Sequence, residues 1–148
     1  MNFEDTMKMA ISSPDEMQHS ILLEIMEETL DLHPWYLDLK TNLIYASPRL
    51  KIKYGHPRDF GPIPYEEYMS SMTLITDHRY LERMKMRCIN EKQKIELQID
   101  AMHQQSGDTL RVHIVSWPLV LNKEVVGLYG YDRIIEILTS TRKPISLI

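Results

Sequence analysis

The sequence predicts an α+β fold, in which an antiparallel sheet carries short helices on one face. Five segments alternate apolar and polar residues with a period of two, and the helical segments gather between the second and third of them. The last three such segments are joined by tight turns, which favours an α+β layout over an alternating α/β one. The 148 residues, 43% of them hydrophobic, suffice for one domain with its own core.

The first predicted element is an amphipathic helix over 13–33. Ser13 caps it and Pro14 occupies its first turn, while Pro34 ends it because the residue before a proline is pushed out of the helical region. Its apolar stripe has to be buried, either on the free face of the sheet or against a second copy of the chain. We expect a homodimer built on this stripe, whose members are Met17, Ile21, Leu22, Ile25, Met26 and Leu30.

Acidic residues are concentrated in the same part of the chain. The net charge is −4, but residues 1–34 carry −7 and the remainder carries +3. Glu24, Glu27 and Glu28 fall on the side of the helix opposite its apolar stripe, where we expect a solvated face. Such acidity repels phosphates and no segment is typical of a recognition helix, so direct nucleic-acid contact is not predicted. Residues 1–12 show no clear pattern and form either a loose leader or an extra short helix.

A hairpin and a short helix come next. Residues 35–46 read as two short strands around a polar turn at 40–42. The helix that follows is capped by Ser47 and closed by Gly55, a residue that tolerates the left-handed conformation of a helix end. The segment 56–64 contains three prolines, so we expect a loop there.

Two helices and three strands complete the pattern. The helices are expected at 65–72 and at 77–90, the second with Leu81, Met84 and Cys88 on one face. The strands are expected at 94–100, 110–121 and 125–131. Proline cannot donate to a strand ladder, so Trp117 and Pro118 mark an edge or a bulge. We expect the bulge, with Trp117 covered by the leader helix or a partner.

Four segments carry a family resemblance. Residues 35–55 combine a strand, a polar turn, a second strand and a helix ended by glycine, and 75–79 stand at the entry to a longer helix. Residues 107–110 hold a Gly-Asp turn, and 126–134 form a last strand that ends in Asp-Arg-Ile. In this order the segments resemble a PAS domain over 35–136, although the family's usual ending is Asp-Ile-Thr.

The resemblance implies a small cavity between the inner face of the sheet and the helices. Such cavities bind small ligands when apolar walls surround a few polar groups. The alternative is that the inward residues simply pack as core, because periodicity identifies a face and not an empty space. The candidate pocket residues are Tyr54, Tyr68, Met72, Leu81, Met84, Cys88, Ile99, Ile114 and Leu128.

The resemblance also implies a regulatory or sensory role in signal transduction. Residues 139–144 interrupt any coiled-coil heptad, so 137–148 is expected to be a linker to a downstream effector domain, such as a helix-turn-helix transcription factor. The alternative is a ligand-free dimerisation or protein-interaction module of a sensor kinase or a cyclic-dinucleotide enzyme. Asp132 and Arg133, where the last strand ends, are candidates for signal output, or else an ordinary surface ion pair.

No cofactor is predicted. Haem in this family is bound by a histidine of the long connecting helix, which makes His78 the candidate, and a surface histidine in a capping turn is the alternative. Flavin-binding light sensors of the family carry an Asn-Cys-Arg run, which does not surround Cys88. The histidines lack metal-ligand spacing and no catalytic constellation occurs, so we expect neither a metal site nor an enzyme. With no signal peptide and no long apolar run, the chain is expected in the cytoplasm and off the membrane.

Overall fold

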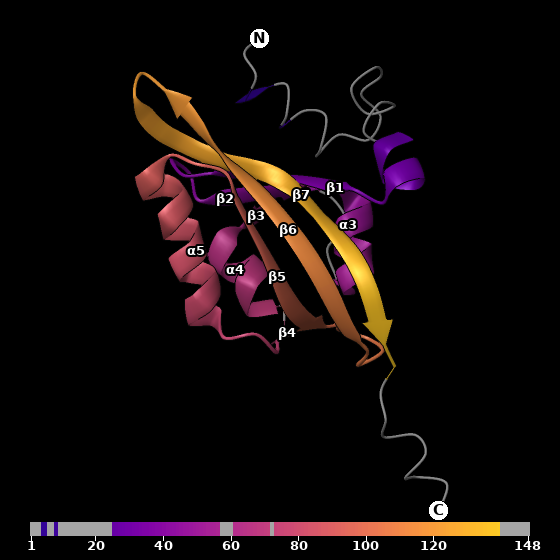
Figure 1. Cartoon of the computed structure of the whole chain (residues 1–148). Helices are drawn as coiled ribbons and strands as arrows, with labels where there is room; N and C mark the ends of the chain where they lie inside the picture. The colour runs from indigo at the N-terminus through magenta and orange to yellow at the C-terminus, as the bar shows by residue number, and fades with distance from the viewer. Residues whose placement is uncertain (1–3, 6–7, 9–24, 57–60, 72, 140–148) are drawn as a thin grey trace, which may run out of the picture.

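The computed structural model describes residues 4, 5, 8, 25–56, 61–71 and 73–139, which form an antiparallel sheet with helices on one face (Figure 1). Its five long strands join in the order β2, β1, β7, β6, β5, so the N-terminal hairpin pairs with the last strand of the chain. Two-residue strands extend both edges, β3 beside β2 and β4 beside β5. This confirms the α+β prediction. The strands are β1 (His33–Asp38), β2 (Leu43–Ala46), β3 (Ile63–Pro64), β4 (Thr73–Leu74), β5 (Ile95–Met102), β6 (Thr109–Leu121) and β7 (Glu124–Leu138).

Three helices cover the inner face of the sheet, and their ends follow from local sequence. α3 (Pro48–Tyr54) begins where the Ser47 hydroxyl accepts a hydrogen bond from the Leu50 amide at 3.1 Å. It ends at Gly55, whose φ of 75° suits a residue without a side chain. α4 (Tyr65–Ser71) follows β3, and α5 (His78–Glu91) begins at the predicted cap Asp77. No helix among the described residues is long and apolar enough to cross a membrane.

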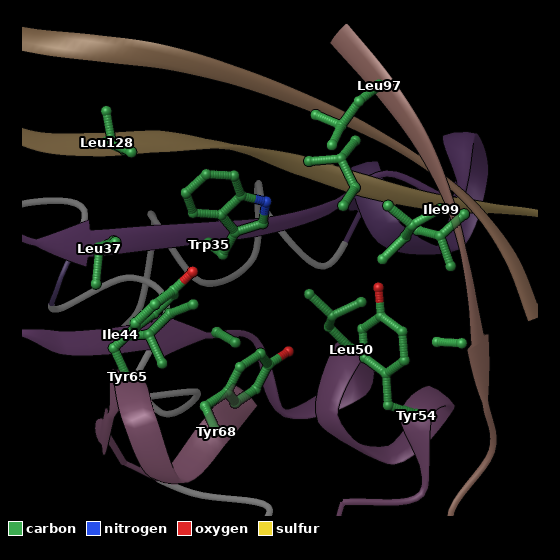
Figure 2. Packing of buried hydrophobic residues seen from close by; sticks show 14 of the residues in the cluster. Trp35, Leu37, Ile44, Leu50, Tyr54, Tyr65, Tyr68, Leu97, Ile99 and Leu128 are labelled. Atoms are coloured by element: carbon green, nitrogen blue, oxygen red, sulfur yellow. The ribbon is translucent and has the colours of Figure 1, made fainter. Parts of the chain in front are cut away.

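The core lies between these helices and the inner face of the sheet (Figure 2). Along β5 the odd-numbered residues are buried, whereas the even-numbered residues are exposed or half-buried, as a period of two requires. Leu97 and Ile99 from this strand face Leu50 and Tyr54 of the α3 region across the core. Burying a side chain of this size stabilises the fold by about 1.5–3 kcal/mol.

The last strand is longer than its sequence suggested. β7 runs to Leu138, beyond the expected strand end at Tyr131 and past the domain boundary expected at 136. It pairs with β6 over that whole length, whereas β1 pairs with it only from Gly127 to Asp132. Among the described strands, residues 133–138 of β7 therefore have a neighbour, β6, on one side only.

The bulge expected at Pro118 lies one residue further along β6, after Leu119. The register of β6 against β7 shifts between Leu119 and Val120, and the extra residue, Val126, belongs to β7. β5 begins at Ile95, opposite Ser116, so Pro118 lies where β6 has lost that neighbour. Pro118 therefore occupies an edge position, which tolerates a residue without an amide hydrogen.

Aromatic residues occupy the outer face of the sheet. The Trp117 ring stacks on Tyr129 with centroids 5.8 Å apart and contacts Tyr131 at 6.0 Å. Among the described residues, Trp117 is thus contacted by these two tyrosines and by the Lys94 ammonium, 5.3 Å from the centre of its ring. Residues 13–24 of the leader helix, the other expected cover, lie outside the described residues. One leader residue does reach this face, because the Lys8 ammonium lies 2.5 Å from the Asp38 carboxylate and 5.4 Å from the centre of the Tyr45 ring.

The predicted N-terminal helix is described over 25–30 only. Asp31, with a φ of 55°, ends it shortly before β1 begins at His33. Ile25 and Leu30 are 54% and 52% exposed, and Met26 is half-buried. The other three members of the predicted dimerisation stripe, Met17, Ile21 and Leu22, lie outside the described residues, as does the predicted start of the helix.

Candidate functional site

A cavity of about 90 Å³ lies between the inner face of the sheet and helices α4 and α5. All five long strands contribute to its wall, and Tyr54 contributes from the end of α3. In Figure 2, Trp35 extends from β1 into this layer, with Tyr54 and Tyr68 directed toward the sheet from the helices. The lining residues are mostly apolar or aromatic: Trp35, Leu37, Ile44, Tyr54, Tyr65, Tyr68, Met69, Leu81, Met84, Lys85, Ile95, Leu97, Ile99, Ile114, Ser116, Leu128 and Asp132.

Most of the predicted pocket residues border this cavity. These are Tyr54, Tyr68, Leu81, Met84, Ile99, Ile114 and Leu128. Cys88 is buried but does not line it, because its sulfur lies beside Ser116, 3.8 Å from both the carbonyl oxygen and the hydroxyl. Burial raises the pKa of this thiol. Met72 lies outside the described residues.

Asp132 is the polar group that sequence reasoning misplaced. We expected it near the surface with Arg133, but it is only 7% exposed and borders the cavity, whereas Arg133 is exposed. The two residues point to opposite faces of β7, so they form no output pair on one surface. Asp132 and the inward Leu128 are separated by an even number of positions in the same strand, which predicts that both side chains point to the inner face.

Two neutral donors hold the Asp132 carboxyl group. The Trp35 indole N–H donates to Oδ1 at 2.9 Å, and the Tyr54 hydroxyl donates to Oδ2 at 2.7 Å. Burial raises the pKa of Asp132 to about 6, because it penalises the charged form more than these hydrogen bonds favour it. The cavity wall therefore contains a carboxyl group whose protonation changes close to neutral pH.

A second polar group borders the cavity on its helical side. The Lys85 ammonium of α5 lies 4.2 Å from the centre of the Tyr65 ring and 3.6 Å from Oε2 of Glu82. The Tyr65 hydroxyl donates to the other Glu82 oxygen at 3.3 Å. Lys85 thus has a carboxylate and an aromatic face as its described partners.

Comparison with known proteins identifies the fold. No protein-family model and no curated protein matches the sequence. Among solved structures, the N-terminal domain of a diguanylate cyclase with a PAS/PAC sensor from Marinobacter aquaeolei matches with a TM-score of 0.60 at 19% identity, over 70% of this chain and 94% of that one. The chain has a PAS-like fold.

Two further structures agree on this fold. A sensory box histidine kinase/response regulator from Burkholderia thailandensis matches with a TM-score of 0.60 at 16% identity, covering 83% of this chain and 88% of that one. The PAS domain of an HTR-like protein from Haloarcula marismortui matches with a TM-score of 0.52 at 15% identity, covering 78% and 91%. The PAS-like prediction from the sequence is confirmed at the level of the fold.

A buried polar cluster joins the N-terminal helix to the PAS-like sheet. Glu27, expected on a solvated face, is only 8% exposed. Its Oε2 lies 2.6 Å from His33 Nδ1 and accepts a hydrogen bond from the Ser47 hydroxyl at 2.7 Å. The other ring nitrogen of His33 lies 2.7 Å from Asp31. His33 is also the β1 partner of Asp132 in β7, which places this cluster next to the cavity wall.

The PAS-like cavity does not fit the haem option. His78 is exposed in the first turn of α5 and does not line the cavity. The volume of about 90 Å³ is well below the roughly 300–1,000 Å³ of pockets for drug-sized ligands. Within the described residues no group of three or more metal-ligating side chains comes together.

Proposed function

We propose that this chain is a sensory domain of a signal-transduction protein, which binds a small ligand in its inner cavity and forms a homodimer through its N-terminal helix. The observation that supports ligand binding is a cavity with apolar walls and one buried carboxyl group, Asp132. Similar folds occur in proteins described as a PAS/PAC sensor and as a sensory box histidine kinase. The proposed role is one of binding and not of catalysis, in the cytoplasm.

The contacts of Asp132 suggest how a ligand would act. A ligand that changes the position of this carboxyl group also changes its hydrogen bonds to Trp35 on β1 and Tyr54 on α3. Both elements also contact the Glu27 cluster, through His33 and Ser47 respectively. For signalling, the ligand must bind one packing of this region more tightly than the other.

We propose that the signal passes to a downstream effector domain, with a helix-turn-helix transcription factor as one candidate. The sequence of residues 139–144, which breaks any heptad, supports a linker to a separate domain over a continuous coiled coil. In this proposal the chain itself does not contact nucleic acid.

A ligand-free dimerisation or protein-interaction module is the second candidate. The exposure of Ile25 and Leu30 favours it, because two large apolar side chains on one short helical segment form a surface that a partner can cover. Similar folds occur in a diguanylate cyclase and in a histidine kinase, so such a module could belong to an enzyme of either kind.

Native mass spectrometry and thermal unfolding across a metabolite panel test the ligand proposal. A ligand present at 100 times its Kd stabilises the folded state by about 2.7 kcal/mol, which is visible as a rise in Tm. Met84→Trp should fill the cavity and abolish the rise, whereas Met86→Trp, on the exposed side of the same helix, should keep it. Bare polypeptide in the mass spectrum together with an unchanged Tm across the panel would favour the ligand-free module.

A further inference from the structure

The cavity carboxyl group lacks a cationic partner. Among the described residues, no lysine, arginine or histidine forms an ion pair with Asp132, and its two hydrogen-bond donors are neutral. The nearby His33 ring attracts the charged form of Asp132, but its two nitrogens lie against two other carboxylates, Glu27 and Asp31. An ionised carboxylate buried without a counter-charge is costly, and a bound cation would remove most of that cost.

The walls around Asp132 suit an organic cation. Trp35, Tyr54, Tyr65 and Tyr68 all line the cavity. The faces of aromatic rings carry negative charge density and attract ammonium groups, most strongly where water is excluded. The Lys85 ammonium already lies against one such face, that of Tyr65. Apart from Lys85 and Ser116, the remaining wall is apolar and suits carbon atoms.

An anionic ligand fits this cavity less well. An anionic ligand would need Lys85, the cation that lines the cavity, but this ammonium already contacts Glu82. An anion would also lie in the same small space as Asp132, and two like charges in one desolvated site repel each other. A neutral apolar ligand would fill the space but would leave the carboxylate without a counter-charge.

Volume limits the size of the ligand. A dry apolar cavity of 150 Å³ accommodates benzene, so the roughly 90 Å³ found here corresponds to about four non-hydrogen atoms. A short alkylammonium ion is small enough for this volume and carries the positive charge that Asp132 requires.

We propose that this cavity selects a small organic ammonium ion, whose nitrogen pairs with Asp132 while its carbon atoms lie between the aromatic walls. The proposal rests on the proposed ligand-sensing function and names the class of ligand. It assigns Asp132 as the specificity-determining residue.

Three probes of about four non-hydrogen atoms each separate the charge classes: n-propylammonium chloride, propan-1-ol and sodium acetate, compared at equal ionic strength on the full chain. The chain contains two tryptophans, whose indole N–H resonances provide paired reporters. Trp35 lines the cavity and donates to Asp132, whereas Trp117 lies on the outer face of the sheet and is the internal control. Propylammonium should shift the Trp35 resonance alone and bind about tenfold more tightly than propanol.

The variant Asp132→Asn keeps the size of the side chain and removes its charge. It should reduce the preference for propylammonium over propanol to about one. If this variant does not fold, the comparison of the three probes on the unaltered chain still decides the proposal.

The outcomes are distinct. Equal or tighter binding of acetate or propanol at Trp35 would overturn the ammonium proposal and leave ligand sensing intact. Unchanged propylammonium binding in Asp132→Asn would overturn it too. No response to any of the three probes would overturn the ammonium proposal. If the metabolite panel gives no response either, the ligand-sensing proposal is overturned as well.

Discussion

At the level of single residues, Asp132 determines the chemistry of the cavity. Its carboxyl group is held by an indole and a phenol, so its position is well defined although no cation among the described residues forms an ion pair with it. A buried group of this kind costs stability when ionised, and this cost makes it sensitive both to pH and to a bound cation. Asp132 therefore contributes little to stability at neutral pH, and in the proposed sensor its contribution is to ligand selectivity.

The pH dependence of stability tests this description. The pKa of Asp132 is about 6 in the folded state against 3.8 for the ordinary side chain, so the folded state binds the proton more tightly. The resulting stabilisation is fully present below about pH 4 and is lost as pH rises through about 6, a change of about 3 kcal/mol. Urea unfolding of the unaltered chain and of Asp132→Asn, measured across this range, isolates the effect because all other groups titrate in both proteins. Parallel stability curves would contradict the raised pKa.

At the level of elements, the described end of the N-terminal helix is connected to the sheet through a buried carboxylate, that of Glu27. Glu27 contacts His33 at the start of β1 and Ser47, the cap of α3. The Glu27 carboxylate thus links the N-terminal helix, β1 and α3. The apolar residues of the same segment, Ile25 and Leu30, remain on the surface.

Neighbouring glutamates give a matched test of this link. Glu27→Ala should lower the free energy of unfolding by about 1.5–3 kcal/mol, because it removes a buried acceptor of two hydrogen bonds, one of them to His33. Glu28→Ala should cost less than about 1 kcal/mol, because Glu28 is exposed and its described contact is a surface pair with Arg49. Urea denaturation measures both losses, and equal losses would show that the Glu27 contacts do not stabilise the fold.

At the level of the whole molecule, the sheet brings the two ends of the PAS-like region together. β1 lies between β2 and β7, so the hairpin that opens the region pairs with the strand that closes it. The cavity wall at Asp132 therefore lies next to the start of β1, which follows the N-terminal helix, and on β7, the last described strand. Dimerisation through that helix would place a subunit interface beside the cavity.

A point substitution tests the proposed dimer. Ile25→Asp should convert a dimer into monomers, because it places a charge in the apolar stripe, whereas Ile52→Asp, on the equally exposed surface of α3, should leave the dimer intact. Multi-angle light scattering reports the mass directly. Removing residues 1–33 is the less specific experiment, because it also deletes Glu27 and the first residue of β1. A dimer mass retained in Ile25→Asp would show that the interface lies elsewhere.

The elements of this protein could be predicted from the sequence because their causes are local. A period of two defines a strand within a few residues, and Ser47, Gly55 and Asp77 each end or begin a helix through contacts with their nearest neighbours. The order of these elements was also enough to predict the PAS-like fold. Seven predicted pocket residues border the cavity. Alternation along the strands identifies the inward face for Ile99, Ile114 and Leu128, and helical periodicity places Leu81 and Met84 on one face of α5.

The roles of the charged residues were decided by the tertiary structure. Asp132 and its donor Trp35 are 97 positions apart, and only the pairing of β1 with β7 brings them together. Glu27 reads as a surface residue on a helix, yet it is buried because His33 and Ser47 provide partners there. A polar side chain can be buried when partners satisfy it, and those partners come from distant parts of the chain. The sequence by itself therefore determined the framework of this protein, whereas the fold determined which carboxyl group borders its cavity.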